Sequence, residues 1–181
     1  SLAQYSDGTL TYREVHRFEN RPRQADGHFR WDFADLMENV YKGIEKAGEF
    51  DSIGFDTWGV DFGLLDENGK LLGDPVHYRD GRTTGMVEQA EKIMPQAELY
   101  GATGSQIMAI NTLFQLLALQ KEQPELLKQA KRLLFMPDLF AHALCGSEVC
   151  ETAIASTSQM LDAKSGGWSK PVLEAFNIPE Q

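Results

Sequence analysis

The segment from Ser52 to Asp61 constrains the fold of this chain more than any other part of its sequence. Residues 52–57, Ser-Ile-Gly-Phe-Asp-Thr, form a short apolar run that ends in polar residues, a pattern typical of a buried strand in a parallel sheet. A helical pattern precedes this run: Asp32 is a good N-cap, apolar residues recur at helical spacing after it, and Gly48 favours a stop. A helix that leads into a buried strand predicts an α/β or α+β domain.

The rest of the chain carries weaker patterns of the same mixed kind. Alternating residues and turn signals predict two hairpins, one from residues 2–5 and 9–18 and the other from residues 60–65 and 70–72. Short strands are expected at residues 76–78 and 133–136, and helices at residues 84–94, 111–122, 125–131 and 138–144, with a last short helix in the tail that holds Trp168 and Pro171. Residues 152–159 are rich in Ser and Thr, which indicates a loop.

Charge and composition exclude several classes of partner. The chain has 181 residues, with 17 basic and 27 acidic side chains, so its formal net charge is −10. Because a polyanion favours a basic surface, nucleic acid and anionic membrane are poor partners. No apolar run approaches the roughly 20 residues that span a bilayer. Cys145 and Cys150 are expected to be free thiols, and the four scattered histidines predict no metal cluster. A cytoplasmic location is the default expectation, and the oligomeric state has no signal in the sequence.

The densest chemistry lies where the predicted strand ends. Residues 56–61 hold two carboxylates, a hydroxyl, an indole and the bare backbone of Gly59. Polar groups at the carboxyl end of a strand in an α/β sheet commonly face a ligand crevice. Carboxylates accept hydrogen bonds from sugar hydroxyls, and an indole covers the apolar face of a sugar ring. A tight turn with Trp58 packed in the core explains the same residues equally well.

A second polar segment, Tyr78-Arg-Asp-Gly-Arg-Thr83, has two interpretations of its own. Its two arginines and its aspartate could bind a polyol, or they could form a solvated, salt-bridged turn. The charge pattern by itself favours the turn.

Taken in order, these segments resemble the FGGY carbohydrate kinase family. The resemblance rests on residues 13–18, Trp31-Asp32, residues 51–62 with Asp56-Thr-Trp-Gly-Val-Asp-Phe62, Tyr78-Arg-Asp80 with Arg82-Thr83, Asn111-Thr-Leu-Phe-Gln-Leu116, residues 123–126 and Met136-Pro-Asp-Leu-Phe140. It implies two actin-like, ribonuclease-H-like α/β domains with a cleft between them, and residues 1–181 as part of the first, sugar-binding domain. It also implies transfer of the γ-phosphoryl group of ATP, with Mg²⁺, to the 1-hydroxyl of L-rhamnulose.

The resemblance assigns sugar-binding roles to individual residues. Gly59 matches the glycine with which the family contacts its sugar, and Thr57, Trp58 and Asp61 flank it as wall residues. Tyr78 falls where a related polyol kinase places an aromatic ring over its substrate. Three further residues are weaker candidates for the sugar or for ordering its loops, namely Asp80, Arg82 and Asn111.

The resemblance also implies parts that residues 1–181 do not contain. The family's first strand and phosphate-binding hairpin would precede residue 1, and its aspartate base, in a His-Asp-Thr segment, would follow residue 181, as would the second domain. This chain is therefore expected to carry no catalytic base and to be inactive alone, because phosphoryl transfer depends on positioning and charge neutralisation. Two alternatives stay open: a sibling kinase for another ketose or polyol, such as L-fuculose, and a non-catalytic sugar-binding module of the same fold.

Overall fold

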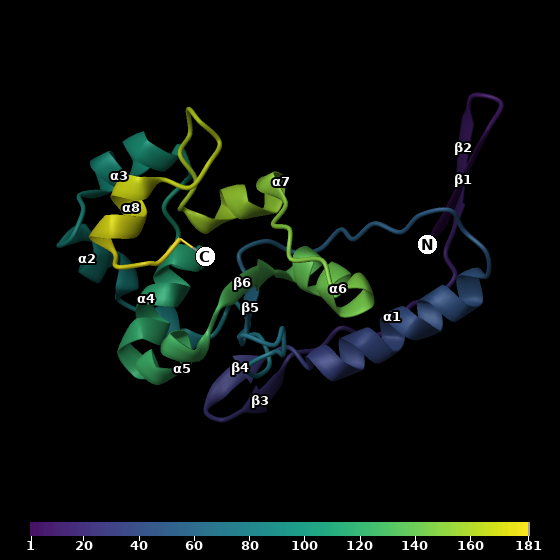
Figure 1. Cartoon of the computed structure of the whole chain (residues 1–181), viewed down its shortest axis with the longest axis horizontal. Helices are drawn as coiled ribbons and strands as arrows, with labels where there is room; N and C mark the ends of the chain where they lie inside the picture. The colour runs from purple at the N-terminus through teal and green to yellow at the C-terminus, as the bar shows by residue number, and fades with distance from the viewer. Residues whose placement is uncertain (181) are drawn as a thin grey trace.

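The computed structural model describes residues 1–180 and divides them between a helical body and an extended arm (Figure 1). Its strands are β1 (Leu2–Ser6), β2 (Thr9–Arg13), β3 (Arg23–Ala25), β4 (His28–Arg30), β5 (Phe62–Leu65) and β6 (Arg132–Phe135). Its α-helices are α1 (Phe33–Ala47), α2 (Met86–Glu91), α3 (Gln96–Thr103), α4 (Thr112–Glu122), α5 (Pro124–Gln129), α6 (Met136–Cys145), α7 (Thr152–Ala155) and α8 (Lys170–Ala175). Two short 3₁₀ turns are η1 (Gly81–Thr83) and η2 (Ser156–Ser158).

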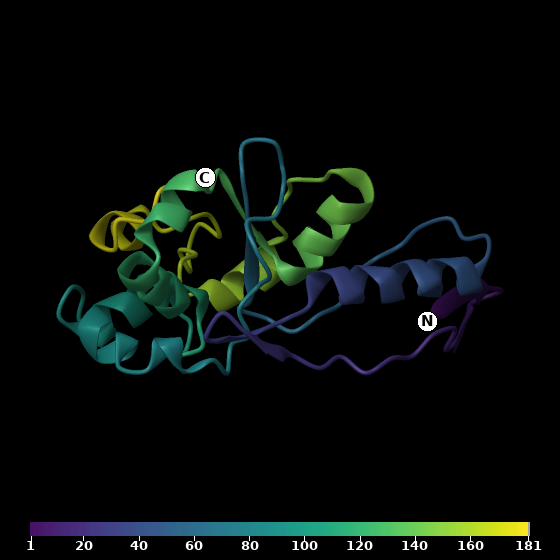
Figure 2. The ribbon, with the colours of Figure 1, turned by 90° about the horizontal axis from the view of Figure 1, so that it is seen from below.

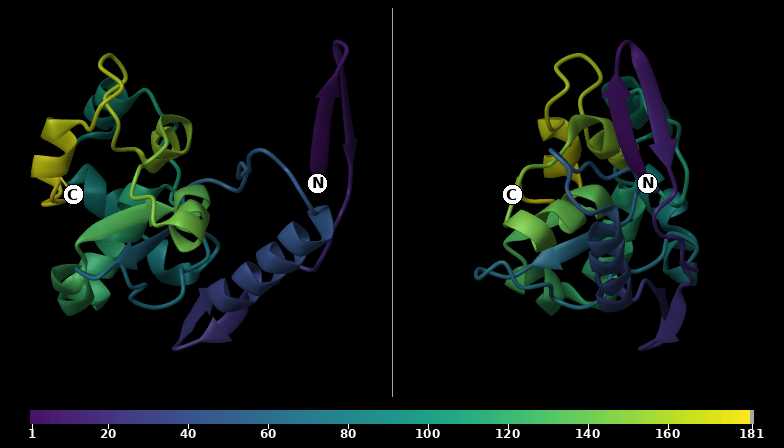
Figure 3. Two further views of the ribbon diagram at one scale, coloured as in Figure 1. Left: turned by 45° about the vertical axis from the view of Figure 1, so that its right-hand side comes forward. Right: turned by 90° about the vertical axis from the view of Figure 1, so that its right-hand side faces the viewer.

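The predicted N-terminal hairpin is confirmed, although it is shorter than expected. β1 pairs antiparallel with β2, with Leu2 opposite Arg13, so the second strand ends well before residue 18. The hairpin stands apart from the helical body (Figure 3). Tyr5 and Tyr12 are 73% and 78% exposed as a result.

The helix predicted after Asp32 is also confirmed. The Asp32 side chain accepts a hydrogen bond of 3.1 Å from the backbone N–H of Asp35, and Gly48 ends α1 with a φ of 77°. Seen from below, α1 runs beside the N-terminal segment and away from the helical body (Figure 2). Its buried residues, Leu36 and Met37, belong to an apolar cluster with side chains of β6 and α6.

The buried strand predicted at residues 52–57 is wrong. These residues have no regular secondary structure, and Ile53 is 48% exposed. A strand is stable only when a neighbour pairs with its backbone. Within residues 1–180, no backbone hydrogen bond joins this segment to another strand. The segment instead borders an open cavity of about 900 Å³ that it shares with α1 and the N-terminal hairpin.

The strand that follows is present, but its main partner is distant in sequence. β5 pairs antiparallel with β6, with Phe62 opposite Phe135, and every strand pair among residues 1–180 is antiparallel. The predicted return at residues 70–72 is only partly strand-like: Leu72 N–H donates to Leu64 O at 2.8 Å, and a single bridge joins Leu71 to Leu65. Residues 76–78 likewise contribute one bridge, from Val76 to Arg30, instead of a strand.

The core of the helical body is built around α4. Seven of its eleven residues are buried, including Leu113 and Phe114, and they pack with β5, β6, α2 and α8. The helices expected at residues 125–131 and 138–144 are found as α5 and α6, whereas only α2 lies within residues 84–94.

The helical segments α3 and residues 152–158 were not predicted. α3 has little amphipathic pattern, and its position depends on packing of Leu99 in the core. The loop predicted at residues 152–159 is helical for most of its length, as α7 and η2. The Glu151 carboxylate accepts hydrogen bonds from the N–H groups of Ala153 and Ile154, which caps α7 despite the poor helix propensity of Ser and Thr. No helix within residues 1–180 is long and apolar enough to cross a membrane.

Candidate functional site

The buried carboxylate of Asp61 is the centre of the candidate site. Asp61 precedes β5 and has no exposed surface. Its Oδ2 accepts hydrogen bonds from Trp31 Nε1 at 2.7 Å, Trp58 Nε1 at 2.9 Å and the backbone N–H of Tyr78 at 3.2 Å. Its Oδ1 accepts one from Gln115 Nε2 at 3.2 Å. Burial raises the pKa of Asp61, and these hydrogen bonds oppose that rise only in part.

Four aromatic rings lie in a row beside this carboxylate. The Trp58 and Trp31 ring centroids are 4.2 Å apart, Trp31 and His77 are 4.3 Å apart, and His77 and Tyr78 are 4.4 Å apart. Trp31 and His77 are buried, whereas Trp58 and Tyr78, at the two ends, are partly exposed. Burial, together with the nearby charge of Arg79, lowers the pKa of His77, which favours the neutral imidazole within the stack.

Gly59 is held against α7 and η2 by a close backbone approach. A Cβ at position 59 would lie 3.1 Å from Cγ2 and 3.2 Å from Oγ1 of Thr157. The Thr157 hydroxyl accepts a hydrogen bond from Val60 N–H at 3.1 Å and donates to Ile154 O at 2.7 Å. Val60 has a φ of 66°, a left-handed conformation that is costly for a β-branched residue. The turn is therefore imposed by its surroundings.

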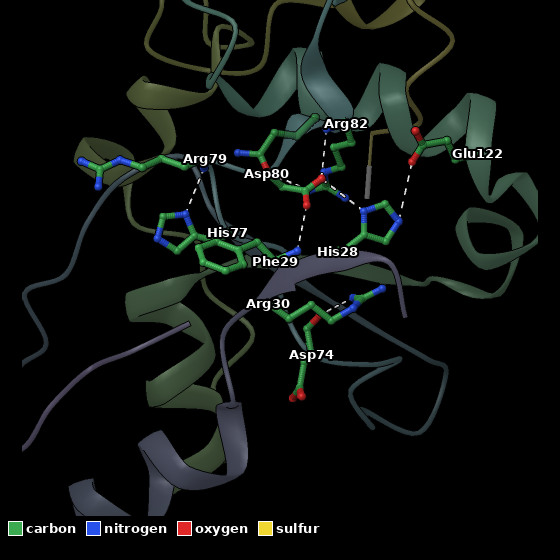
Figure 4. Close-up of polar contacts among 10 residues, drawn as sticks. His28, Phe29, Arg30, Asp74, His77, Arg79, Asp80, Arg82 and Glu122 are labelled. Carbon is green, nitrogen blue, oxygen red and sulfur yellow. Dashed lines mark hydrogen bonds and ion pairs between the residues drawn. The ribbon is translucent and has the colours of Figure 1, made fainter. Parts of the chain in front are cut away.

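Asp80 organises the second predicted segment (Figure 4). Its carboxylate accepts hydrogen bonds from Arg82 N–H at 3.0 Å, Phe29 N–H at 2.8 Å and the His28 ring at 3.1 Å. Burial by itself would raise the pKa of Asp80, but the backbone donors and His28 outweigh burial and lower it. Asp80 thus ties the β3–β4 hairpin to η1.

Arg82 points from η1 toward α4. Its guanidinium donates to Gln115 Oε1 at 2.7 Å, and its Nε has no hydrogen-bond partner within residues 1–180. Burial lowers the pKa of Arg82 to about 10, and the nearby charges of Asp80 and Asp61 oppose this shift. Because that value lies well above neutral pH, Arg82 remains charged.

The structure brings most of the predicted site residues together. Thr57, Trp58, Gly59 and Tyr78 are partly buried, and Asp61 lies behind them. Arg82 is linked to Asp61 through Gln115.

Asn111 is placed differently from the other candidates. Its side chain donates to Gln106 O at 2.8 Å and to Gln159 Oε1 at 2.7 Å, in a buried network that does not include Asp61. It precedes α4 without a side-chain capping bond.

Four residues of this arrangement were not identified from the sequence as site residues: His28, Trp31, Gln115 and Thr157. Trp31 and Gln115 fall within stretches that carry the family resemblance, and that was the only signal available for them. His28 and Thr157 carry no local signal at all. All four reach the site through contacts between distant parts of the chain.

The described residues offer no metal centre. Within residues 1–180, no group of three or more His, Cys, Asp or Glu side chains is placed to hold a metal ion. The donors around Asp61 are indole, amide and backbone N–H groups, which do not ligate cations.

Two solved structures with a similar fold are a xylulose kinase and a glycerol kinase. A xylulose kinase from Lactobacillus acidophilus superposes with a TM-score of 0.78 at 19% sequence identity, covering 89% of this chain and 34% of that one. A glycerol kinase from Plasmodium falciparum gives a TM-score of 0.76 at 18% identity, covering 89% and 35%. The fold is therefore the actin-like, ribonuclease-H-like fold of these kinases.

The chain belongs to the FGGY family of carbohydrate kinases, whose N-terminal domain matches residues 8–181. It is 42% identical over 184 aligned positions to a rhamnulokinase of Klebsiella pneumoniae (strain 342), covering 98% of this chain and 38% of that protein. It is 39% identical to a rhamnulokinase of Lactiplantibacillus plantarum, covering 99% and 37%. The chain thus spans less than two fifths of the length of these curated relatives.

Proposed function

We propose that this chain is the sugar-binding part of an ATP-dependent kinase that phosphorylates the 1-hydroxyl of L-rhamnulose. The observation that carries the proposal is the 42% identity to a rhamnulokinase, which extends over 98% of the chain. The segments that form the candidate site, residues 57–61 and 78–82, lie within this aligned region.

The sugar is proposed to lie against the partly exposed groups of the site. Trp58 and Tyr78 offer aromatic faces to the apolar side of the sugar, and Thr57 offers a hydroxyl. Gly59 lies between Trp58 and Val60 and is proposed to offer its backbone to the sugar, while the side that a Cβ would occupy is filled by Thr157. Asp61 has no exposed surface, so it supports Trp58 and does not contact the sugar itself.

The role of these residues in the reaction is binding and orientation. Phosphoryl transfer is accelerated mainly by holding the acceptor hydroxyl in line with the phosphoryl group and by neutralising charge. The residues proposed to contact the sugar position its acceptor hydroxyl. ATP and Mg²⁺ supply the phosphoryl group and part of the neutralising charge, and we propose that residues outside this chain bind them and provide the base.

Calorimetry with L-rhamnulose tests the proposal directly. The chain is expected to bind L-rhamnulose more tightly than L-fuculose, and Trp58→Phe is expected to weaken binding about tenfold, because it removes indole surface and the Nε1–H bond to Asp61. Trp168→Phe is the matched control, since Trp168 is also partly buried but packs with the α2–α4–α8 core.

The outcomes are distinct. Tighter binding of L-fuculose would contradict the choice of sugar. Binding of L-rhamnulose that is unaffected by Trp58→Phe would contradict the location of the site. Phosphorylation of L-rhamnulose by the 181-residue chain alone, measured as ADP release with ATP and Mg²⁺, would contradict the proposal that the base and the nucleotide site lie elsewhere.

A further inference from the structure

We propose that Gln115 is a positioning residue of the sugar site, whose side-chain amide joins Arg82 to Asp61 and thereby fixes the Trp58 indole. This inference rests on the proposed function for its sugar, but the contacts that carry it belong to the chain itself. Gln115 lies in the first turns of α4, has no exposed surface, and is more than 30 residues away in sequence from both partners.

The chemistry of its partners determines the orientation of the Gln115 amide. A guanidinium has only donors, so Arg82 must meet the amide oxygen, and the contact is 2.7 Å. The Asp61 carboxylate is an acceptor, as are the backbone carbonyls of Val60 and Ile110, and these three lie 3.2, 3.2 and 2.9 Å from Nε2. Rotating the amide by half a turn would place NH₂ against the guanidinium and remove the Gln115 donor from all three acceptors, of which Val60 O would keep the Thr112 hydroxyl.

A neutral amide performs both tasks at this position, whereas a charged side chain would perform only one. A lysine would donate to Asp61 but repel Arg82, and an ionised glutamate would accept from Arg82 but repel Asp61. The amide therefore lies between the Arg82 guanidinium and the Asp61 carboxyl. Its oxygen accepts a hydrogen bond from the first, and its NH₂ group donates one to the second. This arrangement leaves Asp61 Oδ2 free to accept from both indoles and from Tyr78 N–H.

Gln115 holds the residues proposed to contact the sugar through two separate contacts. Through Asp61, Gln115 sets the acceptor that holds the Trp58 ring. Through Val60 O, it helps to hold the strained residue that follows Gly59, together with Thr112 Oγ1 at 2.7 Å from the same carbonyl. One side chain thus couples the turn at residues 57–61 to the η1 turn that contains Arg82.

The test compares two glutamines of the same helix. Gln115→Met keeps the length of the side chain but removes donor and acceptor. Gln120→Met is the matched control, because Gln120 Nε2 also donates to two backbone carbonyls, those of Phe176 and Asn177, at the other end of α4. Indole ¹H–¹⁵N resonances are recorded without sugar, and L-rhamnulose affinity is measured by calorimetry.

Gln115→Met is expected to shift the indole resonances of Trp31 and Trp58 and to leave that of Trp168 in place. It is expected to weaken L-rhamnulose binding about tenfold, as for Trp58→Phe, because both variants loosen the hold of Asp61 on the Trp58 ring. Gln120→Met is expected to leave both indoles in place and to change affinity less than about twofold. If Gln115→Met does not fold, Gln115→Glu carries the same expectations at a pH where the new carboxyl is ionised, because it then keeps the acceptor for Arg82 and removes the donor to Asp61.

Unchanged Trp31 and Trp58 resonances in the Gln115 variant would overturn the inference, as would an affinity equal to that of the Gln120 variant. Failure of the unsubstituted chain to bind L-rhamnulose would overturn the proposed function instead. In that case, shifted indoles would still support the positioning of Trp58 by Gln115.

Discussion

Replacing Asp61 by Ala should destabilise the fold strongly, because it removes the acceptor shared by four donors. Two of those donors have alternatives: Trp58 is partly exposed to water, and Gln115 Nε2 also reaches the carbonyls of Val60 and Ile110. The other two, Trp31 Nε1 and Tyr78 N–H, would be left without an acceptor in a buried or partly buried place.

The size of the effect follows from these two stranded donors. Each buried donor that loses its acceptor costs about 1–3 kcal/mol, and removal of a desolvated carboxylate returns part of that cost. The net loss in unfolding free energy is therefore about 2–4 kcal/mol. Asp61→Asn should lose less, because its carbonyl oxygen can still accept from the indoles.

The assay is urea unfolding followed by far-ultraviolet circular dichroism, which does not depend on the tryptophans being perturbed. Asp138→Ala is the matched control. Asp138 is also buried, with 6% exposure, and burial also raises its pKa. Among residues 1–180, the one backbone donor to its carboxylate is Glu151 N–H at 3.2 Å, and the Cys150 thiol is a weak second donor. Its loss should be about 1 kcal/mol.

Equal losses for the two alanine variants would refute this reasoning. Such a result would mean that burial of the carboxylate, and not the number of donors it serves, determines its contribution. A larger loss for Asp138 would refute it more strongly.

Three further predictions concern pH, packing and thiol chemistry. Because burial raises the folded-state pKa of Asp61, the proton-dependent part of its stabilisation is fully present below the ordinary carboxyl pKa of about 4 and is lost as the pH rises through the raised value. The hydrogen bonds that its oxygens accept persist over this range. Urea titrations should show wild type losing stability relative to Asp61→Asn across that window, and a constant difference would contradict this. Gly63→Ala should lower the unfolding free energy by about 1–3 kcal/mol in a thermal melt, because its Cβ would lie 2.7 Å from a leucine methyl of α6. Gly101→Ala in α3, with open space around it, should raise that free energy by about 0.5–1 kcal/mol. Equal effects would show that the contact at Gly63 is relieved. Ellman's reagent should modify the exposed Cys145 quickly and Cys150 slowly, since burial raises the pKa of Cys150 to about 12, and a fast phase that survives in Cys145→Ser would contradict that order.

Elements with local signals were predicted well from the sequence. The N-terminal hairpin followed from its turn residues, α1 from its cap and stop, and α4 from the helical pattern after Asn111. In each case, residues close together in sequence supply the hydrogen bonds that begin or end the element.

The strand expected at residues 52–57 shows the limit of such patterns. Its apolar run is the same whether or not a neighbour pairs with it, because pairing is a property of two segments and the pattern describes one. Within residues 1–180, β6 pairs with β5, and no strand pairs with residues 52–57.

The candidate site likewise has features that are local in sequence and features that depend on contacts between distant residues. The sequence by itself determined its chemistry: an indole, a carboxylate and a bare glycine within residues 56–61, and a charged turn that follows Tyr78. Only the tertiary structure decided that Asp61 is buried and serves Trp31, Trp58 and Gln115, with partners 30 and 54 residues away. A side-chain hydrogen bond depends on distance and direction in space, so a contact across that separation leaves no periodicity for a sequence pattern to reveal.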